Sequence, residues 1–262
     1  MDTWLNNALF GWYPYVALTV FLLGSLLRFD HSQYTWRTGS SQLLRRRQLT
    51  WGSNLMHVGI LAIFGGHLVG LLTPVIVFDT LGISHTFKQL LAMVVGGVAG
   101  VACWIGIVLL AHRRLFDARI RNTSTFADIA ILLILWLQLT IGLSTIVISA
   151  NHLDGQEMLK FMTWAQGIMT LSPGVAVVVA DVNPIFKLHL FLGMTIFLVF
   201  PFTRLVHVWS APIWYLGRKG FQIVRTTRGI VGRPKPAGDT PKANFTAPRA
   251  GVAQPHPVAG ND

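Results

Sequence analysis

Four histidines lie inside two apolar stretches of the chain, where ionisable side chains are unusual. His57 and His67 belong to HVGILAIFGGHLVGLLTP, and His189 and His207 belong to HLFLGMTIFLVFPFTRLVH. An imidazole in apolar surroundings is costly unless it is hydrogen-bonded or coordinated, so these residues are candidates for a functional role. Neutral imidazole is also the commonest metal ligand in proteins, and the two pairs therefore suggest a bound metal centre.

The segments that carry these histidines are predicted to be transmembrane helices. The chain has 262 residues, of which 52% are hydrophobic and 12% charged, and its mean hydropathy is +0.54. A helix needs roughly 20 apolar residues to cross about 30 Å of hydrocarbon. Five such windows occur, at residues 8–27, 54–74, 89–111, 127–149 and 187–209. The predicted fold class is an all-α membrane protein, a bundle of five transmembrane helices.

The basic residues predict the orientation of this bundle. Most of the 21 Lys and Arg residues follow the first, third or fifth window, and only Lys88, Lys160 and Lys187 fall on the other side. Because basic loops stay in the cytoplasm, the N-terminus is expected outside and the C-terminus in the cytoplasm. The formal charge of +11 is explained by this asymmetry and by anionic lipid headgroups, and no nucleic acid is expected as a partner. Asp2, with no Lys or Arg before the first window, favours a retained helix over a signal peptide.

The remaining segments predict smaller features. Residues 1–225 are expected to form the transmembrane domain, and residues 226–262, rich in Pro, Gly and basic residues, a disordered cytoplasmic tail. The outer connection contains NHLDGQEMLKFMTWAQGIM, with the spacing of a short amphipathic helix. Thr125 and Asp128 have the spacing of a capping box, so Asp128 is interpreted as a helix cap rather than a proton carrier. The single Cys103 supplies neither a disulfide nor an iron–sulfur ligand set.

Topology predicts which histidines meet. The second and fifth helices run antiparallel, which places His57 level with His207 and His67 level with His189. Two imidazoles from opposite sides are the axial ligands of a haem iron with no open position, whereas zinc requires three or four clustered ligands. A continuous fifth helix would place His189 and His207 on one face, five turns and about 27 Å apart. The other pair is only about 15 Å apart, so straight helices cannot bring both pairs level.

Other interpretations of these residues stay open. Transmembrane histidines also form hydrogen bonds between helices, as in a haem-free anchor or transporter. Nearby glycines would clear space for macrocycles or serve ordinary helix packing, and Arg204 would pair with a haem propionate or simply flank the helix. The remaining histidines lie in loops, helix ends or the tail and are discounted as ligands: His31, His85, His112, His152 and His256.

Long strings of the sequence resemble one known family. The strings are WYPY, QYTWR, SNLMHVGILAIFGGHLVGLLTP, RRLFDARIR, DGQEMLKFMTWAQ, KLHLFLGMT and FPFTRLVHVWS. Over about residues 11–220 they resemble the gamma subunit of membrane-bound respiratory nitrate reductase, a cytochrome b that oxidises quinol. The resemblance implies two b haems, the inner held by His57 and His207 and the outer by His67 and His189. It also implies a quinol site beside the outer haem, with Lys88 and His67 as tentative quinol-site residues.

The resemblance also implies partners and a location. An iron–sulfur beta subunit and a molybdenum-containing alpha subunit would reduce nitrate on the cytoplasmic side, docked on the basic inner loops of this chain. The membrane would be the cytoplasmic membrane of a bacterium or archaeon. The expected function is quinol oxidation near the outer face, with electrons passed inward to those subunits. A di-haem cytochrome b of another membrane oxidoreductase is the alternative within the redox class.

Overall fold

The computed structural model describes residues 3–35 and 44–210 of the chain. Contacts divide the chain into a unit from Met1 to Ala211 and a unit from Pro212 to Asp262, and only the first contains described residues. The predicted cytoplasmic tail, residues 226–262, lies outside them. Most of the basic cluster after the fifth window and part of the first inner loop lie outside them as well.

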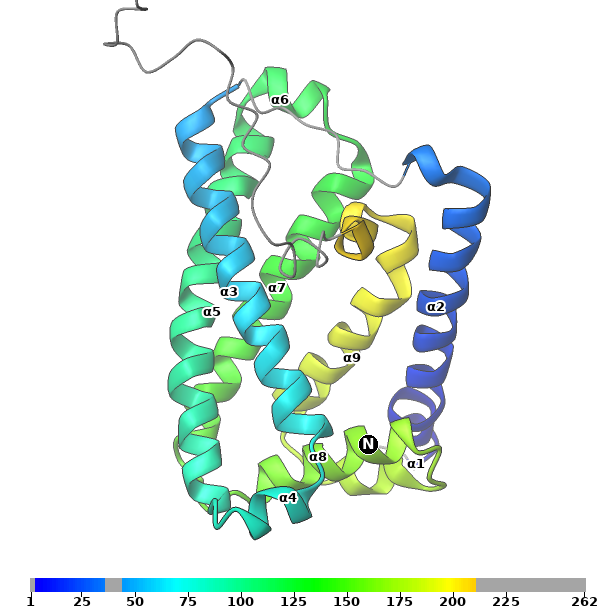
Figure 1. Ribbon diagram of the computed structural model, residues 1–262, viewed down its shortest axis with the longest axis vertical. Coiled ribbons are helices and arrows are strands. Elements are labelled where there is room, and N and C mark those ends of the chain that lie inside the picture. Colours follow the sequence, from blue (N-terminus) through cyan, green and yellow to red (C-terminus); the bar gives the residue numbers. More distant parts are fainter. Residues whose placement is uncertain (1–2, 36–43, 211–262) are drawn as a thin grey trace, which may run out of the picture. The chain divides into compact units, whose positions relative to one another are not determined.

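Five helices in the described residues are long and apolar enough to cross a membrane, which confirms the predicted fold class (Figure 1). The first span, Thr3–Ser32, consists of α1 (Thr3–Asn7), the π-helical η1 (Ala8–Trp12) and α2 (Tyr13–Ser32). The others are α3 (Arg46–Leu72), α5 (His85–Phe116), α7 (Phe126–Ser149) and Pro184–Phe202, which comprises α9 (Pro184–Val199) and η4 (Phe200–Phe202). The shorter elements are η2 (Gln33–Thr35), α4 (Val75–Thr80), α6 (Ala118–Asn122), α8 (Gln156–Met169), η3 (Val175–Val179) and η5 (Arg204–Ser210).

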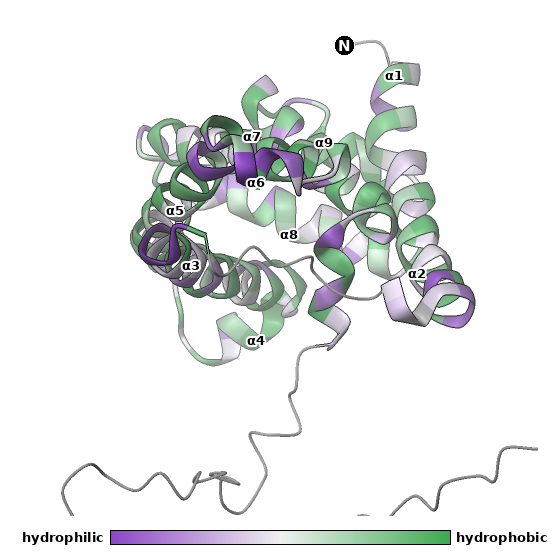
Figure 2. Ribbon diagram, turned by 90° about the horizontal axis from the view of Figure 1, so that it is seen from above, coloured by the Kyte–Doolittle hydropathy of each residue, from purple (hydrophilic) through white to green (hydrophobic). Residues whose placement is uncertain are grey.

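The spanning helices pack in one series, in the order α3, α5, α7, α9 and α2. α3 packs along α5, and α5 also packs on α7, whereas α9 packs between α2 and α7 (Figures 1 and 2). Glycines allow the closest approach, because a Cβ at Gly59 would lie 2.6 Å from both the carbonyl oxygen of Ala99 and the Cβ of Cys103. Such contacts are typical of small residues at membrane helix interfaces. α3 and α9, which carry three of the four histidines, thus have different main neighbours.

One end of the bundle is closed by α8, η3 and α4, and we call it the α8 end (Figure 1). The amphipathic helix predicted in the long connection is α8, which confirms that prediction. Its apolar face is buried against Phe10, Val175 and neighbouring residues, and Trp164 Nε1 donates to the carbonyl oxygen of Phe10 at 2.9 Å. Gln166 Nε2 donates to the carbonyl oxygens of Leu71 and Thr73 at the end of α3.

The opposite end carries α6, and we call it the α6 end (Figure 1). The N-terminus of α7 lies here and has the predicted capping box. Thr125 Oγ1 accepts from the backbone N–H of Asp128, and Asp128 Oδ2 accepts from that of Thr125. Asp128 is therefore a helix cap, as the sequence indicates.

The fifth helix is not continuous, contrary to the sequence-based expectation that His189 and His207 share one helix face. α9 ends at Val199, Pro201 lies in η4, and Thr203 is extended, with φ −116° and ψ 179°. Proline has no backbone N–H and its ring clashes with the preceding helical turn, so the helix breaks here. η5 then runs across the bundle and is seen nearly end-on in Figure 1. This break removes the mismatch between the two pairs, because His207 is no longer a straight helix length from His189.

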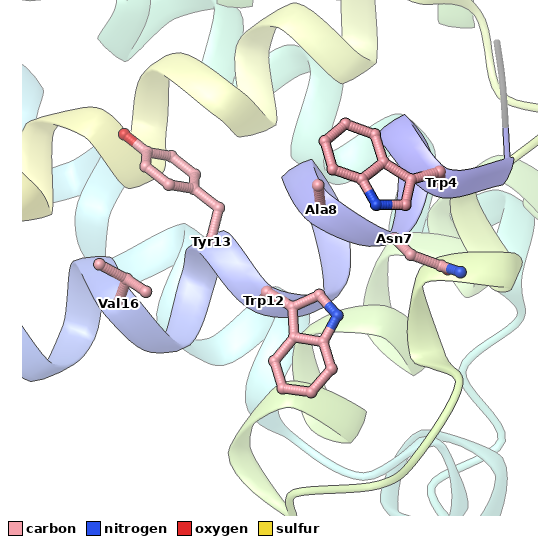
Figure 3. A pocket seen from close by; sticks show the side chains of 6 residues that line it. All are labelled: Trp4, Asn7, Ala8, Trp12, Tyr13 and Val16. Carbon is pink, nitrogen blue, oxygen red and sulfur yellow. The ribbon is translucent and has the colours of Figure 1, made fainter.

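The first span is fastened along α9. Near its start, the Tyr13 hydroxyl points toward α9 (Figure 3) and lies 2.8 Å from Thr195 Oγ1. Tyr13 also lines a hollow of about 460 Å³ on the surface, together with Trp4 and Trp12 of the same span. Further along, the ring of Phe21 packs edge-on against Phe200, with centroids 4.8 Å apart. The first span therefore supports the part of the chain that leads to His207.

Candidate cofactor site

The structure brings the four histidines together in the two pairs that topology predicts. The ring centroids of His57 and His207 are 6.1 Å apart, with ring planes at 68°. Those of His67 and His189 are 6.3 Å apart, with planes at 43°. His57 and His67 come from α3, and their partners from η5 and α9, so each pair joins two segments that are distant in the sequence.

The spacing within each pair fits a single metal ion between two imidazoles. Two metal–nitrogen bonds of about 2 Å place the nitrogens about 4 Å apart, and each ring centre lies about 1 Å further out. The expected distance between centroids is therefore about 6 Å, close to both observed values. Imidazoles that hydrogen-bond each other directly, with nitrogens about 2.9 Å apart, would lie about 1 Å closer.

Backbone carbonyls orient three of the four rings. Nδ1 of His57 lies 2.7 Å from the carbonyl oxygen of Ser53, and Nδ1 of His67 lies 2.8 Å from that of Ile63. Nδ1 of His207 lies 2.6 Å from the carbonyl oxygen of Arg204. An Nδ1–H that donates to a carbonyl leaves the Nε2 lone pair for a metal. Each of these three rings is thus oriented with its Nε2 available to bind a metal.

His189 is held differently, by α7. Its Nδ1 is buried with no hydrogen-bond partner in the structure. Gln138 Nε2 donates to the carbonyl oxygen of His189 at 3.1 Å and lies 3.5 Å from its Nε2. A Cβ on Gly142 would lie 2.8 Å from Cε1 of the ring, so only glycine leaves this space for the imidazole. Gln138 and Gly142, which the sequence analysis did not single out, therefore form the cradle of His189.

The donor set fits haem better than a protein-ligated metal cluster. Within residues 3–35 and 44–210, no three His, Cys, Asp or Glu side chains gather as a structural zinc site would require. Each pair offers two neutral imidazoles, which is the axial set of a six-coordinate haem iron. The orphaned Nδ1 of His189 and the space beside Gly142 are further features of a site that holds a ring ligand.

The glycines near the histidines divide between the two roles that the sequence left open. Gly59 serves helix packing against α5, and a Cβ at Gly193 would lie 3.3 Å from Gln138 Nε2. Gly65, Gly66 and Gly70, in contrast, have nothing within 4 Å of an added Cβ. These three flank His67 and face open space, which is compatible with a macrocycle beside this ligand.

Lys88 is buried at the α8 end, only 7% exposed. Its Nζ donates to Sδ of Met162 on α8 and lies 3.8 Å from the ring centroid of Phe78 on α4. No carboxylate of the described residues lies within 4 Å of it, although Asp79 is nearby in the chain. A buried lysine held by a thioether and an aromatic face is poised to interact with an oxygen anion or hydroxyl. It does not snorkel to the surface, so simple interfacial flanking does not describe it.

Arg204 is bound to Asp128 of α7, with Nε 3.2 Å from Oδ1. Arg114 of α5 lies 3.8 Å from the same carboxylate. This triad joins three segments at the α6 end, and it accounts for Arg204 without a propionate. The propionate role of Arg204 stays a prediction.

The other histidines within the described residues lie where the sequence analysis expected them. His31, His112 and His152 are exposed, and His85 lies 3.7 Å from the carboxylate of Asp79 at the start of α5. His256 lies outside the described part of the chain. None of these four histidines belongs to either pair.

Comparisons with known proteins find relatives over most of the chain. Residues 6–227 match the nitrate reductase gamma subunit family. The chain is 52% identical to the respiratory nitrate reductase 1 gamma chain of Escherichia coli K12 over 221 residues, covering 84% of this chain and 97% of that one. It is 52% identical to the respiratory nitrate reductase 2 gamma chain of the same organism over 228 residues, 87% and 100% of the two chains. With the nitrate reductase gamma chain of Bacillus subtilis 168 it shares 39% identity over 213 residues, 81% and 95%.

Proposed function

Because the chain belongs to the nitrate reductase gamma subunit family, we propose that it oxidises quinol and delivers the electrons to the subunits that reduce nitrate. As a family member it is a membrane subunit of an oxidoreductase complex. The observation that carries the finer proposal is the pair of imidazole couples at the spacing of axial metal ligation.

Each couple would hold one haem b. His57 and His207 would bind the haem near the α6 end, which we call the inner haem, and His67 and His189 the outer haem nearer the α8 end. When bound, such haems would supply one-electron transfer. The backbone carbonyls of Ser53, Ile63 and Arg204 fix the rings so that Nε2 faces the metal position. Two such sites in series suit the transfer of electrons from one face of the membrane to the other.

The quinol site would lie at the α8 end, near His67 and Lys88. Lys88 would donate a hydrogen bond to a quinol oxygen or a haem propionate, and so hold the headgroup near the outer ligand pair. α8 and α4 cover this lysine through Met162 and Phe78 and keep it out of bulk water. An ammonium held there favours the deprotonated oxygen of the quinol, because opposite charges attract more strongly where water is excluded. The protons released would leave toward the outer face.

The α6 end would be the docking face for the partners. It carries the described basic residues of the inner loops, including Arg45, Arg46, Arg47, Arg119 and Arg121, which are exposed. The partners would be an iron–sulfur beta subunit and a molybdenum-containing alpha subunit, and nitrate would be reduced on the latter. The bilayer would be the cytoplasmic membrane of a bacterium or archaeon, with quinol drawn from its pool.

The test is a reduced-minus-oxidised visible spectrum of the purified complex, with haem quantified per chain. We expect two b haems that are reduced by a quinol analogue. His57→Ala and His207→Ala should remove the same haem, and His67→Ala and His189→Ala the other. His112→Ala, an exposed histidine of α5, is the matched control and should keep both.

The contrary results are equally clear. If the protein is folded, was produced with an adequate haem supply and still contains no b haem, it is a haem-free anchor and the proposal fails. If His57→Ala and His189→Ala removed the same haem, the proposed pairing would be refuted. Unchanged quinol oxidation in His67→Ala would refute the outer site.

A further inference from the structure

The imidazole of His207 is carried by a short irregular turn rather than by a transmembrane helix. Its Nδ1 is held by the carbonyl oxygen of Arg204 within η5, which follows the extended Thr203. A short 3₁₀ segment is less rigid than an α-helix, because its hydrogen bonds are fewer and have poorer geometry. The place of His207 relative to His57 therefore depends on whatever holds this turn to the bundle.

One arginine of the first span binds the turn directly. Nη1 of Arg28 donates to the carbonyl oxygen of Pro201 at 2.7 Å and to that of Thr203 at 2.8 Å. Nη2 donates to the carbonyl oxygen of Thr35 at 3.1 Å, and Nε to its hydroxyl at 3.4 Å. A single guanidinium thus joins the end of the first span to both sides of the helix break.

These carbonyls need such a donor. The break at Pro201 removes helical N–H partners from the carbonyls around it, and an unpaired carbonyl away from water is strongly unfavourable. Charged donors form the strongest hydrogen bonds, and the planar fork of arginine reaches several acceptors at once, which the ammonium of lysine does less well. The geometry explains why an arginine stands at this position.

The surrounding contacts show that the first span is built to fit the break. A Cβ at Gly24, one helical turn before Arg28, would lie 2.8 Å from Cγ of Pro201. The ring of Phe21 packs against both Phe200 and Trp209, with centroids 4.8 Å and 5.5 Å apart. These residues lie on one face of α2, at spacings of three and four residues, and all of them contact the segment from Phe200 to Trp209.

The turn is held from a second side by α7. Asp128 binds Nε of Arg204, the residue whose carbonyl orients His207. At the peptide between Thr203 and Arg204, Arg28 therefore binds the carbonyl oxygen of Thr203, and Asp128 binds the side chain of Arg204. His207 follows three residues later, so a small rotation of this peptide would move its ring.

We propose that Arg28 is a positioning residue for His207 and sets the geometry of the inner haem ligand without contacting the haem itself. The proposal rests on the proposed function, because it takes His207 as a ligand of the inner haem. It assigns to Arg28 a role beyond that of a basic residue flanking a transmembrane helix. The outer pair, His67 and His189, has no contact with this turn and serves as an internal reference.

The experiment compares Arg28→Gln, Arg28→Lys and the control His31→Gln in the full chain within its membrane complex. His31 is exposed on the same helix, three residues after Arg28, and its Nδ1 lies 3.2 Å from the carbonyl oxygen of Leu27. The readouts are the midpoint potential of each b haem and the ferric electron paramagnetic resonance signal, which reports the orientation of the two imidazole planes. The inner signal is identified as the one that His57→Ala removes.

We expect Arg28→Gln to shift the potential and the resonance signal of the inner haem, or to remove that haem, while the outer haem keeps both values. Arg28→Lys, which retains the charge but not the planar guanidinium, should give a smaller shift in the same direction, and His31→Gln should give none. If Arg28→Gln does not accumulate, the lysine variant decides alone.

An inner haem with wild-type potential and signal in both Arg28 variants would overturn the proposal, and so would equal changes in the two haems. A wild-type complex without two b haems would instead refute the proposed function, before any variant is compared. The two failures are thus distinguishable.

Discussion

Gly142 and His189 meet where α7 and α9 cross. An added Cβ at Gly142 would lie 2.8 Å from Cε1 of the imidazole and 3.4 Å from its Nδ1. Overpacking of this kind costs about 1–3 kcal/mol. The position of the His189 ring therefore depends on a residue that has no functional group of its own.

We predict that Gly142→Ala displaces the ring of His189 and lowers the occupancy of the outer haem, while the inner haem is retained. The measurement is haem content per chain with a redox titration. Gly97→Ala is the control, because its Cβ would lie 3.6 Å from Ile146, an ordinary contact. Full outer haem in Gly142→Ala would mean that the ring has more room than the structure indicates.

Lys88 provides a second prediction at the scale of single residues. Lys88→Met keeps the length of the side chain but removes the charged donor, and a hydrogen bond to a charged group contributes about 1.5–3 kcal/mol. We expect quinol oxidation to fall by roughly tenfold to a hundredfold, with both haems still present. The assay is quinol-dependent reduction of the haems in membranes.

Lys160→Met is the matched control for this change. Lys160 also lies at the α8 end, but it is bound to Asp181 at 2.8 Å on the surface. Its replacement should leave quinol oxidation within about twofold. Equal losses in the two variants would assign the effect to positive charge at this end rather than to Lys88.

At the scale of the elements, the contact between α3 and α5 is the tightest in the bundle. A Cβ at Gly106 would meet the backbone nitrogen of Met56 and lie 2.8 Å from the carbonyl oxygen of Gly52. Backbone atoms cannot move aside as a flexible side chain can. We therefore predict that Gly106→Ala pushes α3 away from α5 and costs at least about 1–3 kcal/mol of stability.

The measurement for Gly106→Ala is the thermal unfolding of the purified protein in detergent. Gly96→Ala on the same helix has nothing within 4 Å of its Cβ, and it should be neutral or slightly stabilising. If both variants unfold at the same temperature, the two helices do not pack as closely as the structure shows.

The sequence predicted the long elements well because they follow from length and composition alone. It singled out the four histidines because ionisable side chains are costly in apolar segments, and it predicted their pairing because antiparallel helices leave one choice. The break at Pro201 was missed, since Phe, Leu and Val continue into FPFTRLVH at the end of the apolar window and hydropathy does not register a turn. The proline itself was the available signal.

Arg28 and Gln138 were missed for a different reason. Arg28 was counted only as a basic residue that follows the first window, and Gln138 is an uncharged residue within the fourth. Their partners are 173 and 51 residues away in the chain, and such contacts have no periodicity in the sequence. A polar side chain within an apolar segment is the signal that would have found Gln138.

For the whole molecule, the distribution of basic residues predicts the N-terminus outside and the C-terminus in the cytoplasm. We expect a reporter enzyme that is active only in the cytoplasm to be active when fused after Arg121 and inactive when fused after His152. A second reporter enzyme, active only outside the cytoplasm, is the complementary control and should give the reverse result at both positions. The reversed pattern would place the α8 end in the cytoplasm and contradict the proposed direction of electron transfer.

One ion pair at the α8 end, between Lys160 and Asp181, contributes to stability in a defined pH range. A hydrogen bond from Lys160 lowers the pKa of Asp181, and the same bond raises the pKa of Lys160. The carboxylate contributes stability that is present above its unfolded pKa and lost as the pH falls through the lower folded value. The ammonium contributes stability that is present below its unfolded pKa and lost as the pH rises through the higher folded value.

Both groups are therefore charged from about pH 5 to about pH 9, and the contribution of this pair should be constant over that range. Hydrogen–deuterium exchange of α8 is the measurement, with Asp181→Asn as the comparison. We expect the variant to differ from the parent by a small, constant amount, because the pair is partly exposed. A difference that changes steeply within this range would assign the titration to other groups.

The order of the chain has a consequence for biosynthesis. His57 and His67 lie on the second span, whereas His189 and His207 lie on or after the fifth, which α2 and α7 support. A nascent chain thus exposes two single imidazoles in the membrane until its last span is inserted. A ribosome that stopped before Pro184 would release four spans with no complete pair. Maturation of both sites is therefore confined to the end of translation, when the last span and the turn behind it arrive.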